Sequence, residues 1–553
     1  MKTSLRLKPD LKWMARQRDL LDQVKIEVNR HLGQDPEDVR RYSSAYLAEF
    51  RSWNEATLDD LQDQMEKANI VFGGDFHAFA QAQRTHLRFL RFLAPKRKIV
   101  LALECFEIRA QKWLDLYLAG QLSLDGLRRE TNWERRWGFP WENYVPLLEL
   151  AKIYGFRLVG INKSMPRRSD NELHLRDQKS AKIICREMIK NPDALVYVIY
   201  GDLHLARKHL PLEVKQCLAS FRARNRPVLR DLIVFLNSEK IYFDLASRGL
   251  ELSVDVVRLG KNRYCVMSSP PWLQWQSYLL YLEKGLEAGL DSSGEGSHFD
   301  YTENVRVFVR HLAREFAIAV KADDFSVHSS EDKELWKILA KNMTTAELKS
   351  ARYLLSTGKS FFIPNRIGCL SRATINQAST LAGQYLHLHL CSRDRSLWHL
   401  PQDFTALIWL EGVSYFFSKM INHKRKAHSL KDVEKQLQRS NEGDDPLVSS
   451  SEMHEALQIA LDVRLSEILL LQTGKRRKLR VRPRHKESYL EAAKILGGML
   501  GERLYVAYRS RKLKKKELLS WFRMDVTTRN FQKSYEKVLR ELSYKISLLD
   551  GEA

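Results

Sequence analysis

Paired cysteines are missing from this chain of 553 residues. It has only six cysteines, and no two of them form a Cys-x-x-Cys pair or stand at a zinc-finger spacing. Thiols this few and this scattered exclude a fold built on disulfides. They indicate reduced cysteines, as in a cytosol.

Long hydrophobic runs are missing as well. No apolar run reaches the about 20 residues that cross a bilayer. The N-terminus, which reads MKTSLRLK, has neither the apolar core nor the small-residue cleavage site of a secretory signal. We therefore expect no transmembrane segment and a cytoplasmic location.

Acidic residues are outnumbered, and the formal net charge is +23. Such an excess favours anionic partners, for example nucleic acid, anionic lipid or phosphate-rich ligands. Two dense basic runs, residues 475–486 and 509–516, carry enough charge to neutralise several phosphates. No helix-turn-helix or RNP signature accompanies them, so they predict an anionic partner without sequence-specific recognition, or solvated loops.

Strands and helices alternate in the first half of the chain. Apolar runs predict strands at 69–73, 98–104, 157–162, 195–200, 228–236, 254–257 and 263–268. Helical patterns between them predict an α/β fold with a mostly parallel sheet flanked by helices. Residues 228–236 and 240–244 are too close for a helical crossover, which predicts an antiparallel hairpin.

A Gly- and Ser-rich segment at 285–299 predicts a linker. We expect a helical preface over residues 1–64 and an α/β domain over 65–284. Leucine periodicity beyond the linker predicts a basic, mainly α-helical domain over 300–553.

Two tetrads with the same pattern follow predicted strands: Gly74-Asp75-Phe76-His77 and Gly201-Asp202-Leu203-His204. Ligands of parallel α/β sheets bind beyond the carboxyl ends of the strands. Two pairs of an acid and an imidazole are therefore predicted to meet at one edge of the sheet.

Glu104, at the end of another predicted strand, completes an ordered set of features. A Trp/Tyr-rich stretch over 133–144 and the strand that ends at Asn162 follow it. The set resembles the ChaN-like domain of the haem-binding-uptake/Tiki superfamily, which also groups TraB-like proteins and erythromycin esterases. The family's residues carry over as His77, Glu104 and His204, with Asp75 where relatives often show Glu. The resemblance implies an α/β sandwich and either metal-dependent hydrolysis or haem binding.

The residue types of this set are those of metal-ion and acid–base sites. His77, Glu104 and His204 would give a divalent metal two imidazoles and one carboxylate, leaving a position for water. Asp75 and Asp202 would orient the imidazoles or act as bases. In a metal-free alternative, His77 is the general base, Glu104 orients it and His204 donates to an oxyanion. In another alternative, each tetrad is only a turn in which the Asp caps the next helix.

Further residues are candidates for ligand binding. Asn162 is expected to line the pocket, and Arg109 is expected to hold an anionic group such as a carboxylate or a haem propionate. Haem would need an axial ligand. The candidates are Tyr144, Tyr117, Tyr154 and His86. Trp133, Trp137 and Trp141 suggest an aromatic lid, with core packing as the alternative.

The sequence thus favours a metal-dependent hydrolase of peptide or ester bonds, acting on a small molecule or a peptide. One alternative is a haem- or iron-binding protein without catalysis. Another is a non-catalytic scaffold that binds nucleic acid or an anionic membrane through its basic helical domain. A homo-oligomer stays open.

Overall fold

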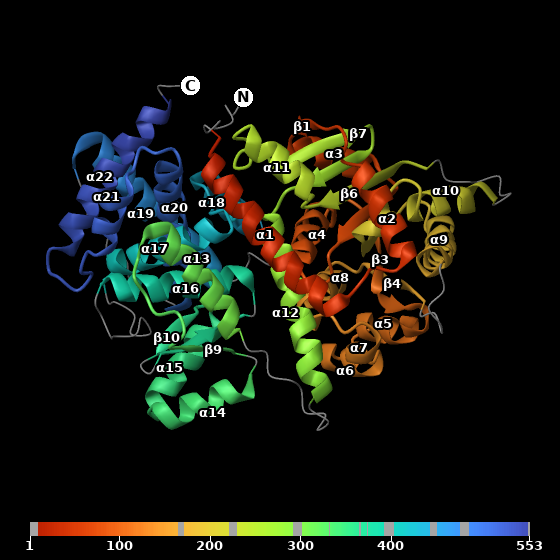
Figure 1. Ribbon diagram of the computed structural model, residues 1–553, viewed down its shortest axis with the longest axis horizontal. Coiled ribbons are helices and arrows are strands. Elements are labelled where there is room, and N and C mark those ends of the chain that lie inside the picture. The colour runs from red at the N-terminus through yellow and green to blue at the C-terminus, as the bar shows by residue number, and fades with distance from the viewer. Residues whose placement is uncertain are drawn as a thin grey trace. The chain divides into compact units, whose positions relative to one another are not determined.

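A computed structural model describes residues 9–163, 171–220, 229–290, 301–330, 332–363, 366–372, 374–391, 403–442, 451–475 and 486–550. The chain divides into two compact units between Leu290 and Asp291. The first unit is coloured red to yellow-green in Figure 1, and the second green to blue.

An eight-stranded sheet forms the centre of the first unit, in the order β1-β7-β8-β6-β2-β5-β3-β4. The six strands from β8 to β4 pair in parallel. Strand β7 pairs antiparallel with β8 on one side and with β1 on the other. The predicted mostly parallel α/β sheet is therefore confirmed. The strands are β1 (Asn54–Ala56), β2 (Ile70–Asp75), β3 (Ile99–Glu107), β4 (Arg157–Asn162), β5 (Leu195–Gly201), β6 (Asp231–Leu236), β7 (Val256–Gly260) and β8 (Arg263–Val266).

The central strands consist almost entirely of buried apolar residues, because helices connect parallel strands and cover both faces of such a sheet. The helices of this unit are α1 (Leu11–Leu32), α2 (Glu37–Ala48), α3 (Leu58–Lys67), α4 (Ala80–Leu93), α5 (Gln111–Leu118), α6 (Leu124–Glu130), α7 (Trp133–Arg136), α8 (Val145–Ile153), α9 (Glu172–Lys190), α10 (Leu210–Ser220), α11 (Glu239–Ser247) and α12 (Pro271–Leu290). Short 3-10 turns are η1 (Ile108–Ala110), η2 (Trp141–Asn143) and η3 (Asp202–Leu205).

Three sequence expectations differ from this structure. Residues 240–244 lie in helix α11, and the antiparallel hairpin is formed by β7 and β8. The helical preface also supplies strand β1 to the sheet edge. Helix α12 continues to Leu290, so residues 285–290 of the expected linker are helical, and 291–299 lie outside the described residues.

The second unit is mainly helical, as predicted. Its central helix α17 is buried along almost its whole length and packs closely on α20, where Gly412 and Gly501 let the backbones approach. The helices are α13 (Thr302–Phe316), α14 (Lys333–Asn342), α15 (Thr345–Ser356), α16 (Ile375–Leu390), α17 (Phe404–Ile421), α18 (Leu430–Glu442), α19 (Ser451–Thr473), α20 (Lys486–Arg509), α21 (Lys515–Phe522) and α22 (Phe531–Asp550). A small sheet, unforeseen from the sequence, has the order β10-β11-β9: β10 (Phe361–Ile363), β11 (Ile367–Leu370) and β9 (Ser326–Ser329).

No helix within the described ranges is both long and apolar enough to span a membrane. Of the two basic runs, residues 476–485 lie outside the described part of the chain. The run at 509–516 joins α20 to α21, and four of its cationic side chains are exposed: Arg511, Lys514, Lys515 and Lys516.

Candidate functional site

The two tetrads begin side by side, because β2 and β5 are neighbouring parallel strands. Their register pairs Gly74 with Tyr200 and Asp75 with Gly201. Strand β3, which carries Glu104, lies on the other side of β5. The carboxyl ends of three adjacent strands therefore bring together residues that are far apart in the chain, such as Gly74 and Asp202.

The glycine of each tetrad lies against the other tetrad. A Cβ atom added to Gly74 would stand 1.7 Å from Asp202 Oδ1, a distance that no side chain can occupy. A Cβ added to Gly201 would stand 3.3 Å from His77 Nε2. Each glycine therefore makes room for a functional side chain of the other motif.

His77 is held by Asp75. The Nδ1 atom of His77 lies 3.0 Å from Asp75 Oδ2, and the same oxygen accepts a 2.7 Å hydrogen bond from the Tyr144 hydroxyl. The other oxygen, Oδ1, accepts from Gln83 Nε2 of α4. The Asp75 carboxylate is thus buried behind His77 and fixed by three partners, which sets the orientation of the imidazole.

Glu104 bridges His77 and an arginine. Its Oε1 accepts a 2.6 Å hydrogen bond from Arg176 of α9, and its Oε2 accepts a 2.7 Å bond from the Gly201 backbone N–H. Oε2 also lies 3.7 Å from His77 Nε2. The carboxylate is therefore fixed by donors on two elements and faces the imidazole.

The ring of His77 is partly accessible and has aromatic walls. Its side chain is 21% exposed. The ring centroids of Trp137 and Phe139 lie 4.5 and 5.0 Å from it. Burial lowers the pKa of His77, but the hydrogen bond and charge of Asp75, together with the charge of Glu104, outweigh burial and raise its pKa above 6.5.

Asp202 is a buried acid, and burial disfavours its charged form. Its side chain is buried against Gly74, and no side chain of the described residues hydrogen-bonds to it. Burial, and next the charge of Asp75, raise its pKa to about 8. Asp202 therefore holds a proton at neutral pH.

His204 belongs to a separate network, which corrects the expectation that Asp202 orients it. Its Nδ1 lies 2.5 Å from Asp177 Oδ1 of α9. The other oxygen of Asp177 accepts a 2.9 Å hydrogen bond from Tyr42 of α2. The aromatic rings of Tyr42 and Tyr200 pack edge-on against His204. The second tetrad thus anchors the preface to the sheet.

The expected metal set does not form. Nowhere in the described part of the chain do three His, Cys, Asp or Glu side chains come together as metal ligands. His77 and Glu104 are neighbours, but His204 is turned to Asp177 because η3 places it on the side of α2 and α9. These residues therefore do not fit a three-ligand metal site.

The candidate ligand-binding residues have other partners. Tyr144 is buried and donates to Asp75. Burial, and next the charge of Asp75, raise its pKa well above 10 and keep it a donor. His86 is buried with both nitrogens bonded, to Tyr197 and to the Gly74 carbonyl.

Arg109 and Asn162 lie at the β3–β4 end of the sheet. The Arg109 guanidinium pairs with Glu107, and Asn162 is half-buried opposite Glu107 in the β4–β3 register. Among the described residues, no hydrogen bond or ion pair is found between either of them and Asp75, His77 or Glu104.

The tryptophans form one aromatic cluster but do not share one helix face. Trp133 is in α7 and Trp141 begins η2, and their ring centroids are 4.7 Å apart. Both are buried, which matches the core-packing alternative, whereas Trp137 reaches His77.

Sequence reasoning missed Arg176, Asp177 and Gln83. All three are in helices, α9 and α4, whose N-terminal turns follow the strand ends. The adjacent pair Arg176-Asp177 in an otherwise amphipathic helix was the available signal. Asp177 is fully buried, unlike most acids in surface helices.

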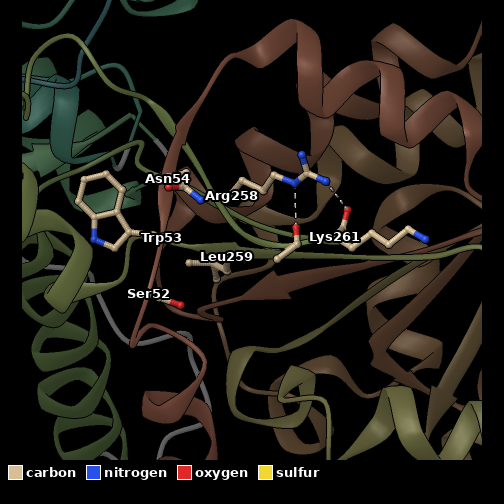
Figure 2. A pocket seen from close by; sticks show the side chains of 7 residues that line it. Ser52, Trp53, Asn54, Arg258, Leu259 and Lys261 are labelled. Carbon is tan, nitrogen blue, oxygen red and sulfur yellow. Dashed lines mark hydrogen bonds between the residues drawn. The ribbon is translucent and has the colours of Figure 1, made fainter.

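A hollow in the surface lies elsewhere. Figure 2 shows this 340 Å³ cavity at the β1–β7 edge, at the opposite end of the strand order from β3 and β4. Ser52, Trp53, Asn54, Arg258, Leu259, Gly260 and Lys261 line it. Arg258 is tied to the Gly260 and Lys261 carbonyls.

Residues 61–170 match the family model described as haem-binding uptake, Tiki superfamily, ChaN. The chain contains a ChaN-like domain. Asp75, His77 and Glu104 lie within the matched segment, and Arg176, Asp177 and His204 lie beyond its end.

Among solved structures, the chain is similar to ChaN of Campylobacter jejuni, whose structure is described as showing cofacial heme binding to that protein. The two chains are 14% identical, and the match covers 38% of this chain and 92% of that one with a TM-score of 0.27. A search of curated proteins found no match.

Proposed function

We propose that the ChaN-like domain hydrolyses ester or peptide bonds, and that His77 acts as the general base. The observation that carries the proposal is the Asp75–His77 pair at the strand ends, with a partly exposed imidazole. A carboxylate that accepts from Nδ1–H holds the tautomer in which Nε2 takes a proton, the arrangement of hydrolytic triads.

The other residues support this role. Nε2 of His77 has no hydrogen-bond partner among the described residues, and the Glu104 carboxylate 3.7 Å away stabilises the imidazolium that forms. In the metal-free alternative from the sequence, Glu104 orients His77. In the structure, Asp75 is the carboxylate that holds His77 Nδ1. His204 has no part in the step, because Asp177 holds it.

The test is hydrolysis of a panel of 4-nitrophenyl esters and dipeptides by the full chain and by His77→Gln. General-base catalysis predicts a loss in kcat of roughly 10²–10⁴-fold. His174→Gln, a half-exposed histidine of α9 outside the cluster, is the matched control. Equal rates for wild type and His77→Gln would refute the proposal.

The proposal also sets a pH profile. A base must be neutral to accept a proton, and the charges of Asp75 and Glu104 raise the pKa of His77 above 6.5 against the effect of burial. We expect kcat/KM to rise with pH and to reach half its maximum above pH 6.5. Asp75→Asn removes a raising charge, so the midpoint should move to lower pH.

Haem binding is the second candidate, favoured by the match to a haem-binding family. Of the side chains considered, His77 fits best, since its ring is accessible between Trp137 and Phe139, whereas His86 and Tyr144 are buried and bonded. His77 would hold the iron of a bound haem. Titration with haemin should then give a Soret band that His77→Ala shifts or abolishes.

A further inference from the structure

We propose that Arg176 binds a carboxylate of the ligand that reaches His77, so that this domain selects anionic ligands. The inference rests on the proposed function, because it assumes that the ligand reacts beside His77. It concerns how the ligand is held, and it can be tested by binding alone.

Arg176 has more hydrogen-bond donors than its bond to Glu104 uses. A guanidinium carries five N–H groups. The interaction found for Arg176 is with Glu104, through one terminal nitrogen at 2.6 Å from Oε1. Its side chain is 20% exposed, so the remaining donors are not sealed in the core. A planar fork with open N–H groups is the geometry that binds carboxylates in a bidentate manner.

The accessible side chains of the cluster are its two nitrogen bases, and its acids are buried. His77 and Arg176 are 21% and 20% exposed, whereas the carboxylates they pair with, Asp75 and Glu104, are 2% and 3% exposed. A ligand that approaches therefore meets the N–H groups of Arg176 before it meets the buried acids. This layering favours an anion although the numbers of acids and bases are equal.

Glu104 sets the spacing between the anchor and the base. It is fixed by the Gly201 N–H and contacts both Arg176 and His77, through different oxygens. The charge of Arg176 also acts on His77 and lowers its pKa. A ligand anchored on Arg176 would thus place an adjacent bond near Nε2.

A purely structural Arg176, present only to neutralise Glu104, predicts something different. In that case the site has no preference for the charge of a ligand. The distinction is measurable with benzoate and benzamide, which have nearly the same shape and differ in charge.

The experiment is a titration of the full chain with benzoate and with benzamide, followed through the imidazole NMR signals of His77. We expect benzoate to bind roughly 10- to 100-fold more tightly, the range for a charge-assisted hydrogen-bonded pair. Arg176→Gln should remove the preference, while Arg186→Gln, at an exposed position of the same helix, should keep it. Equal binding of the two probes, absence of benzoate binding, or a preference that survives Arg176→Gln would overturn the proposal.

Arg176→Gln leaves the Glu104 carboxylate buried without its cation, and this variant could fail to fold. The double variant Glu104→Gln/Arg176→Gln replaces the ion pair by a neutral hydrogen-bonded pair and should fold. Loss of the benzoate preference in a folded double variant supports the anchor, and retention contradicts it. Arg176→Lys should keep part of the preference, because it retains charge without the fork.

The carboxylate has two sources, an organic substrate or a haem propionate. Haemin and its dimethyl ester, titrated in parallel, separate them. A preference for haemin that Arg176→Gln removes assigns the anchor to a propionate, whereas equal haem affinities with a benzoate preference assign it to a substrate. If His77→Gln hydrolyses esters as wild type does but the benzoate preference holds, the proposed hydrolysis fails and the anchor stands.

Discussion

Asp202 shows how one residue can set the pH dependence of stability. Its ordinary pKa near 4 applies to the unfolded chain, whereas burial raises the folded value to about 8. Between these values the folded state keeps a proton that the unfolded state has lost. The free energy of unfolding should therefore fall as pH rises from about 4 to about 8.

Asp202→Asn is expected to remove this fall, because an amide of the same shape has no proton to lose. The variant should match the wild type near pH 4 and exceed its free energy of unfolding by roughly 2–5 kcal/mol near pH 8. Urea unfolding at the two pH values measures this. Parallel stability curves for both proteins would show that Asp202 is not protonated in the fold.

Gly74→Ala tests the contact between the tetrads. The new methyl group would overlap the Asp202 carboxylate, and we expect a loss of about 1–3 kcal/mol, typical of overpacking. Asp202→Ala in the same chain removes the overlap and should recover most of the loss. Gly498→Ala is the control, since its added Cβ has only ordinary contacts. Additive effects of the two substitutions would contradict the contact.

At the scale of elements, helix α2 is joined to α9 of the α/β core by an exposed hydrogen bond from Arg41 to Asn171 and a buried one from Tyr42 to Asp177. The Tyr42 hydroxyl donates to Asp177, which is fully buried and also holds His204. Tyr42→Phe should cost about 1–3 kcal/mol, because a buried carboxylate loses a donor. Tyr46→Phe in the same helix removes a hydroxyl without a hydrogen bond found in the structure and should cost less. Chemical denaturation of the two variants compares them directly.

Helices and strands with one strong period could be predicted from the sequence. The strand predicted at 157–162 is β4 over the same residues, and the strand predicted at 195–200 is β5 with one more residue. The apolar residues within 240–244 form a run of only three, so periodicity alone could not separate a strand from helix α11.

The site could be predicted only in part. Strand ends are visible in a sequence, which is why Asp75, His77 and Glu104 were found. The choice of partner depends on tertiary geometry: Asp177 and not Asp202 binds His204, and Arg176 reaches Glu104 from 72 positions away. Nothing local to either residue marks those contacts.

At the scale of the whole molecule, the two units have separate cores. The helical unit contains a buried ion pair, Lys359 with Glu411, and burial lowers the pKa of Lys359 to about 7. Such a pair tolerates the loss of one partner poorly, because the other charge stays buried.

Calorimetry should therefore resolve two transitions. Lys359→Met is expected to destabilise the helical unit by about 3–5 kcal/mol and lower one transition only. Asp202→Asn should raise only the other near pH 8. A single transition that both substitutions move would mean that the units unfold together.

The two tetrad glycines, Gly74 and Gly201, also constrain how the sequence can evolve. Because Gly74 accommodates Asp202 and Gly201 accommodates His77, neither tetrad can drift independently of the other. A lineage that exchanges the first glycine for a larger residue must first shorten the acid of the second tetrad. In an alignment of relatives, positions 74 and 202 should therefore covary, although 127 residues separate them along the chain.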